Sequence, residues 1–153
     1  MAFADRTLFF SGRSGTPQAI TATAISEDVI SGLFDTGATL HNQSTALDHN
    51  VEPATVPIVI QVTTTFATNT SLTVTLESDS AAGLDSSPTV HWTSGAIAVA
   101  SLVAGYHFLI DYLPAVTNYG AFIGLRYTIG GSNATAGAIY AAIHDRTTNN
   151  LWV

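Results

Sequence analysis

Two acidic residues near the middle of the chain are spaced as a catalytic pair would be. Glu77 and Asp79 end the alternating run SLTVTLESD. Alternate residues of a strand share a face, so these two carboxyl groups would lie about 7 Å apart. Glycosidases use paired carboxylates at such separations. Acids also commonly solvate the end of a strand, and this chain has few aromatic residues to wall a sugar cleft. We therefore expect no glycosidase site here.

The five histidines form no recognisable metal-binding motif. No His-x-His pair occurs. His107 and Asp111 share the face of one expected strand, but four residues of strand separate them by about 13 Å, too far to hold one ion. One polar stretch holds several ligand types close in sequence: His41, Asp48, His49 and Glu52. Solvated loop polarity explains that stretch equally well, so we expect neither a metal nor another cofactor.

Motifs of covalent and phosphate chemistry are also missing from the sequence. The chain has no cysteine, no lysine for a phosphate-binding loop and no Gly-x-Ser-x-Gly elbow. Ser14 stands between two glycines, but at the wrong spacing for an elbow, and a turn explains it. We expect that the protein is not an enzyme and has no catalytic residues.

Composition narrows the class of partner. Hydrophobic residues make up 46% of the chain and charged residues only 10%, against about 25% charged in an average protein. The net charge of −7 argues against nucleic acid and against an anionic membrane surface, because both bind clustered cations. No basic, apolar leader and no run long enough for a membrane helix is present, so we expect neither a signal peptide nor a membrane span.

The periodicity of the apolar residues is that of strands. Leu72, Val74 and Leu76 alternate with threonines, as in a strand with one buried and one wet face. The clearest runs of this kind are Val56–Phe66, Ser71–Ser78, Tyr106–Tyr112, Ala121–Ile129 and Ala136–His144. Weaker runs are Thr7–Ser11, Gln18–Ile25, Val29–Phe34, Thr89–Thr93 and Ile97–Val99. No helix is expected beyond one turn between Ser94 and Gly105.

This pattern predicts an all-β fold. About eight to ten short strands at regular spacing indicate an antiparallel β-sandwich or jelly roll, built as a single domain over residues 1–153. Residues 1–16 form an N-terminal arm and the first strand, residues 35–55 a long loop insertion, and residues 145–153 a C-terminal tail. The tail ends in an apolar Trp152, which either folds back on its own domain or contacts another subunit.

The aromatic residues leave one binding function open. Trp92, Tyr106, Tyr112 and Tyr119 would build a sugar-binding platform if their rings were exposed together. The alternative is that these rings fill the core or a contact between subunits, which is the commoner fate of aromatic residues.

Several short segments resemble, in order, a family of small capsid cement proteins of tailed bacteriophages. The opening segment DRTLFFS, residues 5–11, is the first of them. The others are TATAIS (residues 21–26) leading to Val29-Ile30, LTVTLESD (72–79), SSPT (86–89), LVAG (102–105), Leu113-Pro114, LRYTIGG (125–131) and TAGAI (135–139). They cover most of the chain outside residues 35–55 and the tail.

The resemblance implies a structural virion protein. It would be a β-sandwich or jelly-roll homotrimer that binds the major capsid protein on the outer surface of the head, after assembly in the bacterial cytoplasm. There it would stabilise the head against the pressure of packaged DNA. Another β-structural part of a phage head or tail, or a carbohydrate-binding module, is the alternative. As contact residues we predict Phe3, Arg6, Arg13, His41, Asp48, His49, Arg126, Arg146 and Trp152.

Overall fold

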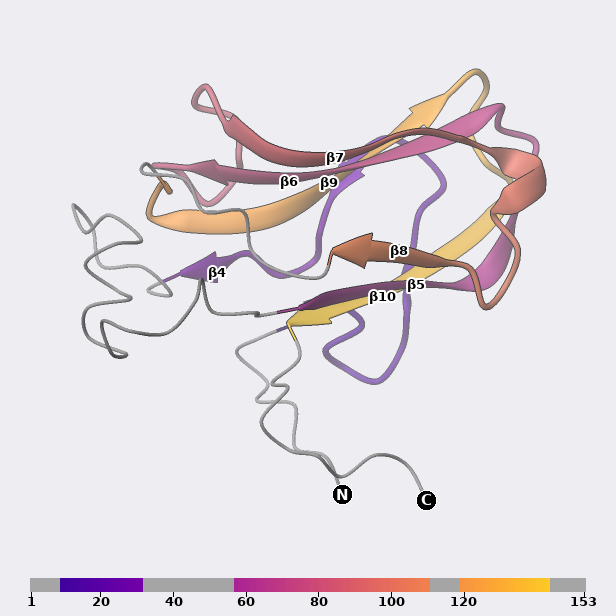
Figure 1. The fold of residues 1–153 in the computed structure, drawn as a ribbon, viewed down its shortest axis with the longest axis horizontal. Helices are drawn as coiled ribbons and strands as arrows, with labels where there is room; N and C mark the ends of the chain where they lie inside the picture. Colours follow the sequence, from indigo (N-terminus) through magenta and orange to yellow (C-terminus); the bar gives the residue numbers. More distant parts are fainter. Residues whose placement is uncertain (1–8, 32–56, 111–118, 144–153) are drawn as a thin grey trace.

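The computed structural model describes residues 9–31, 57–110 and 119–143, which form two antiparallel sheets packed face to face (Figure 1). One sheet has the strand order β1-β10-β5-β8, with β2 also paired to β10. Its strands are β1 (Phe9–Ser11), β2 (Gln18–Ala19), β5 (Ile58–Ala67), β8 (His107–Ile110) and β10 (Ala136–Ile143). The other has the order β3-β9-β6-β7, with β4 also paired to β9. Its strands are β3 (Ala24–Ile25), β4 (Ile30–Ser31), β6 (Ser71–Asp79), β7 (Thr89–Ala98) and β9 (Phe122–Gly130).

The connections between the strands are those of a jelly roll. The first strand lies beside the last, β1 against β10, and β5 separates β10 from β8. From β5 onward the chain crosses to the other sheet at each connection except β6 to β7, which are neighbours in one sheet. A short 3-10 turn, η2 (Val99–Ser101), carries the chain from β7 across to β8. The expected all-β sandwich is confirmed.

Three of the expected runs are divided or joined differently in the structure. The run Gln18–Ile25 is two short strands in different sheets, because the chain crosses between the layers at residues 20–23. The runs Thr89–Thr93 and Ile97–Val99 are joined in the one strand β7, except that Val99 already belongs to η2. A register irregularity lies between the two runs, opposite Thr73 and Thr75. An irregularity of this kind interrupts the alternation of apolar and polar residues. The sequence pattern therefore predicted two strands where the backbone forms one.

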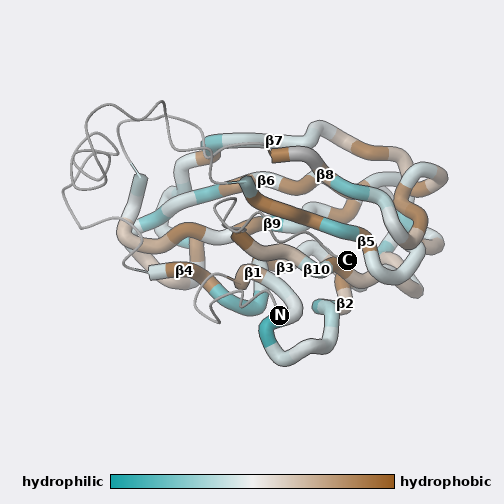
Figure 2. Tube along the Cα trace, turned by 60° about the horizontal axis from the view of Figure 1, so that its bottom comes forward, coloured by the Kyte–Doolittle hydropathy of each residue, from teal (hydrophilic) through white to brown (hydrophobic). Residues whose placement is uncertain are grey.

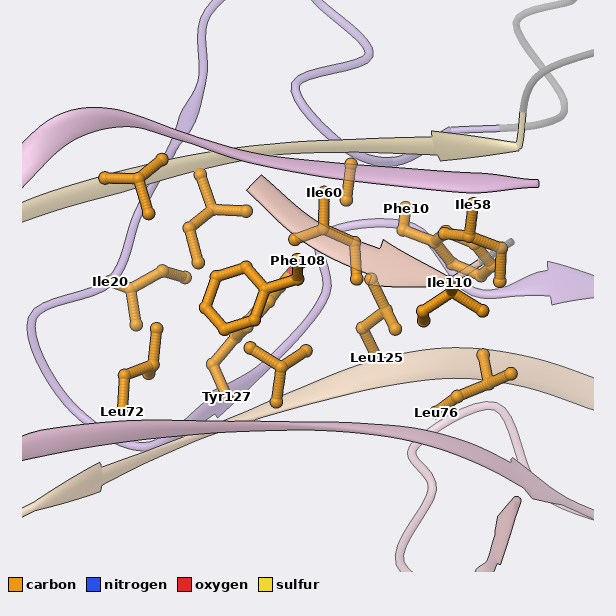
Figure 3. Packing of buried hydrophobic residues seen from close by; sticks show 14 of the residues in the cluster. Phe10, Ile20, Ile58, Ile60, Leu72, Leu76, Phe108, Ile110, Leu125 and Tyr127 are labelled. Carbon is orange, nitrogen blue, oxygen red and sulfur yellow. The ribbon is translucent and has the colours of Figure 1, made fainter. Parts of the chain in front are cut away.

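The core lies between the two sheets and is made by the inward residues of the alternating runs. Ile60 of β5, Leu72 of β6 and Leu125 of β9 are completely buried. Figure 3 shows the side chains of these three residues, with Phe108 of β8, directed into the space between the layers. Tyr127 of β9 is the largest of the fully buried side chains. The strand alternation therefore places the apolar residues as the sequence predicts.

A buried polar chain crosses the core from sheet to sheet. The Ser11 hydroxyl donates to Gln18 Oε1 over 2.6 Å, so the Tyr127 hydroxyl, 2.7 Å from Ser11 Oγ, is the donor to that oxygen. Gln18 Oε1 also accepts from the Glu27 backbone N–H, and Gln18 Nε2 donates to the Ile25 carbonyl. Burial raises the pKa of the Tyr127 phenol, which stays a neutral donor. These bonds fasten the short N-terminal strands to the second sheet.

Tyr127→Phe tests the contribution of this link to stability. Removing the hydroxyl deprives the buried Ser11 oxygen of its donor, so we expect the free energy of unfolding to fall by about 1–2 kcal/mol. Denaturant unfolding followed by circular dichroism measures the change. Tyr140→Phe is the control, because that ring is only partly buried. Equal losses for the two variants would show that the Ser11 bond contributes nothing of its own.

Candidate interaction surface

An ion pair lies on the outer face of the second sheet, away from the core. Arg126 of β9 donates through Nε to both carboxylate oxygens of Glu77 on β6, at 3.1 and 2.9 Å. The Thr75 hydroxyl donates to Glu77 Oε1 over 2.7 Å. The Glu77 side chain is 5% exposed and that of Arg126 29%. A carboxylate that is largely removed from water needs these charged and polar donors.

The loop between β6 and β7 covers this ion pair. Arg126 Nη2 donates to the carbonyl of Leu84, and the Leu84 side chain is fully buried. A Cβ at Gly124 would lie 2.8 Å from Leu84 Cδ1, so the missing side chain at that position makes room for the loop. Leu84 and Ser87 have φ values of +49° and +71°. A backbone in this region persists only where surrounding contacts hold it, and Arg126 supplies one of them.

Asp79 holds the same loop from its base. Its carboxylate accepts from the Ser80 and Ser86 backbone N–H groups at 2.6 and 2.7 Å. Burial opposes ionisation of Asp79, but the N–H donors of Ser86, Ser80 and Ala81 outweigh it and hold the pKa of its carboxyl below the ordinary value. We call Glu77, Asp79 and Arg126 together the loop clamp, since all three fix residues 80–88.

Asp79→Asn should destabilise the protein in a pH-dependent way. The folded state binds the Asp79 proton more weakly than the unfolded chain, so the ionised carboxylate contributes stability above the ordinary pKa of about 3.9. That contribution is lost as the pH falls through the lower folded pKa. The stability difference between wild type and Asp79→Asn is therefore expected to be full at pH 6 and to shrink below pH about 4. Thermal unfolding across this pH range measures it.

The charge-matched control is Asp85→Asn, because Asp85 is an exposed acid of the same loop. A stability difference for Asp79→Asn that does not depend on pH would contradict the assignment.

The two closely spaced acids, Glu77 and Asp79, both belong to the loop clamp. Both residues are buried, at 4% and 5% exposure, and both bind groups of their own chain. The alternating pattern placed the two acids correctly on one strand, but their partners come from another strand and a loop that the pattern does not locate.

A serine and a histidine meet beside the clamp, in an arrangement that the sequence did not indicate. Ser78 Oγ lies 2.6 Å from His91 Nε2 and accepts from the Gly120 backbone N–H over 2.8 Å. The His91 ring stacks on Tyr119 with centroids 4.1 Å apart, and burial lowers the pKa of His91. A hydrogen bond therefore joins the Ser78 hydroxyl and the His91 ring. Such a pair is the beginning of a nucleophilic site, but Ser78 is only 2% exposed. In this structure the pair ties β7 to the start of β9.

The aromatic residues proposed for a sugar platform do not stand free on the surface. Trp92, Tyr106 and Tyr119 are partly buried and pack against the hydrophobic core. The Tyr106 ring also makes an edge-to-face contact with Phe108, with centroids 5.1 Å apart. Tyr112 lies outside the described residues. The described rings therefore contribute to the core, as the alternative interpretation of the sequence had it.

Two of the nine predicted contact residues lie in the described part of the chain. Arg13 forms an exposed ion pair with Asp28 at 3.2 Å, and Arg126 belongs to the loop clamp. Arg126 lies on the outer face of the second sheet, but the structure gives it a partner within its own chain. Its contact with another chain stays a prediction, as does that of Arg13. The other seven lie outside the described residues: Phe3, Arg6, His41, Asp48, His49, Arg146 and Trp152.

In residues 9–31, 57–110 and 119–143, no group of three or more His, Cys, Asp or Glu side chains is placed to hold a metal ion. In the same part of the chain, no helix has the length and apolar character needed to cross a membrane. The loop set His41, Asp48, His49 and Glu52 lies outside this part of the chain.

Comparison with known proteins gives one family. The model of the Bbp16 family matches residues 14–143, which is most of the chain and includes both sheets except the first strand. No curated protein matches the chain significantly. The matched region contains the loop clamp and the whole of β5 to β10. The chain belongs to the Bbp16 family.

Proposed function

We propose that this protein is a capsid cement protein of a tailed bacteriophage. In this proposal it binds the lattice of the major capsid protein on the outer surface of the head, as a homotrimer, and stabilises the head against internal DNA pressure. The observation that carries the proposal is that the family match and the segments resembling cement proteins cover the same part of the chain. The Bbp16 match over residues 14–143 spans the segments that resemble phage cement proteins, from residues 21–26 to residues 135–139.

The surface chemistry of the described residues supports this role. Only seven of them are charged, and the exposed positions of β7 and of the turns are mainly Thr, Ser, Ala and Gly. A surface of this kind can pack closely against other subunits without burying unpaired charges. A trimer can match a local three-fold axis of a shell. Weak contacts repeated around that axis combine into strong attachment.

Two alternatives to the cement role are another part of the phage head or tail and a carbohydrate-binding module. Another β-structural part of a phage head or tail would have the same fold and family, and only its binding target would differ. A carbohydrate-binding module would need exposed rings, whereas Trp92, Tyr106 and Tyr119 pack against the core. The cement role is therefore preferred over the carbohydrate-binding module, and the binding target separates it from another head or tail part.

Two measurements on the purified protein test the proposal. Light scattering gives the mass in solution, and we expect three times the mass of one chain. Co-sedimentation with empty shells of the same phage, followed by heating, should show bound protein and a higher temperature of shell disruption. A protein that does not bind the shells, whatever its mass, would refute the cement role and favour the head or tail alternative.

A further inference from the structure

One side of the sandwich is formed by a continuous stretch without charge. Residues 86–110 contain no Asp, Glu, Lys or Arg. They form β7, η2, the link that follows it, and β8. Strand β7 is an edge strand of one sheet and β8 is an edge strand of the other. Figure 2 shows β7 and β8 along the same side of the molecule. We call this stretch the uncharged side.

The uncharged side also holds the exposed aliphatic residues. Val90 is 52% exposed and Val103 is 49% exposed, and these are the large apolar side chains exposed in the described part of the chain. Val90 lies in β7 and Val103 in the link between η2 and β8. Single exposed valines are common on protein surfaces. Here both fall within the uncharged side.

A long edge strand without charge is exceptional in a protein that works alone. Monomeric proteins guard such edges with lysine, proline, inward charges or bulges. Strand β7 has ten residues, none of them charged and none a proline. Of these protective features, β7 has a local irregularity at Gly95, where φ is +67°. There the Val74 N–H donates to the Ser94 hydroxyl instead of a backbone carbonyl. The irregularity interrupts a regular ladder, so side-chain packing suits this edge better than continuation of the sheet into a neighbour.

Charge identifies the partner that this side fits. Each chain carries a net charge of −7, so two copies repel wherever their charged faces meet. The charged residues in the described part of the chain all lie outside the uncharged side: Arg13, Glu27, Asp28, Glu77, Asp79, Asp85 and Arg126. Residues 86–110 themselves add no charge to a contact between two copies, and Glu77, which lies opposite Val90 in β6, is paired with Arg126.

We propose that the uncharged side packs against other copies of this chain, around the axis of the homo-oligomer. The inference rests on the proposed homotrimer and names the surface by which it forms. Val90 and Val103 are the apolar contacts of that surface, and the exposed Thr89 and Thr93 lie in the same strand as Val90.

The test is a pair of charged substitutions, Val90→Asp with Val103→Asp, studied in the full chain at pH 7.5. Each subunit then carries two buried acids at the contact, so light scattering should show the mass falling threefold, to that of one chain. Circular dichroism confirms that the variant is folded. Thr16→Asp is the matched control. It adds an acid at an exposed position beside β1, at the opposite end of that sheet from β8, and should keep the wild-type mass.

Other outcomes overturn the inference and separate it from the proposed function. A folded double variant with the wild-type mass refutes the surface and leaves the cement role intact. The same mass with loss of shell binding assigns the uncharged side to the capsid protein instead. A monomeric wild type refutes the inference, and shell binding alone then decides the cement role. If the aspartates prevent folding, Val90→Ser with Val103→Ser replaces them. That pair should weaken self-association at least about tenfold, and unchanged association would refute the surface.

Discussion

Arg126→Met is expected to cause one of the two largest losses of stability in this protein. The change leaves the Glu77 carboxylate 5% exposed with the Thr75 hydroxyl as its remaining side-chain donor, and it frees the loop carbonyl of Leu84. Breaking a fully buried ion pair costs about 3–5 kcal/mol, and because Arg126 is 29% exposed we expect a loss of about 2–3 kcal/mol. Denaturant unfolding at pH 7 measures it.

Two further variants isolate the cause of that loss. Arg13→Met removes the arginine of the exposed pair with Asp28, whose side chains are 49% and 32% exposed, and should cost less than about 0.5 kcal/mol. Glu77→Leu combined with Arg126→Met removes both charges and should recover most of the stability, since the unpaired carboxylate is the main penalty. Equal losses for Arg13→Met and Arg126→Met would mean that the loop clamp is no stronger than a surface contact.

The sequence was sufficient for the fold class because strand alternation is a local property. The buried faces of β5, β6, β9 and β10 are those that the apolar residues predict, for example Ile58, Ile60 and Val62 of β5. Strand alternation does not predict the order of the strands in a sheet, because that order depends on contacts between segments far apart in the chain. The sequence therefore left sandwich and jelly roll open, and the pairing of β1 with β10 decides between them.

The same limit explains the site. Arg126 was predicted as a contact residue, but its partner Glu77 is 49 residues away in sequence and becomes a neighbour only because β6 lies beside β9. Ser78 and His91 meet for a similar reason, across β6 and β7. A lone arginine on a strand face predicts an ion pair in general. It does not say whether the partner belongs to the same chain or to another.

Leu102→Ala and Val103→Ala should separate folding from assembly at two adjacent positions. Leu102 is completely buried, and its carbonyl accepts the Phe66 N–H of β5 over 3.0 Å. Truncation leaves a cavity beneath the link between β7 and β8, so we expect the free energy of unfolding to fall by about 3 kcal/mol. Val103 is 49% exposed, and its truncation should change the stability of the isolated subunit by less than about 0.5 kcal/mol.

The two variants must be compared at several protein concentrations, because association adds to apparent stability by mass action. Leu102→Ala should lower the unfolding midpoint at every concentration, since its contacts lie within one subunit. Val103→Ala should lower it only at concentrations where wild type is associated, and the difference should vanish on dilution. A loss for Val103→Ala that persists in dilute solution would place its contacts inside the subunit. Both residues are apolar and adjacent in the segment LVAG, so their burial alone separates Leu102 of the core from Val103, the proposed contact between copies.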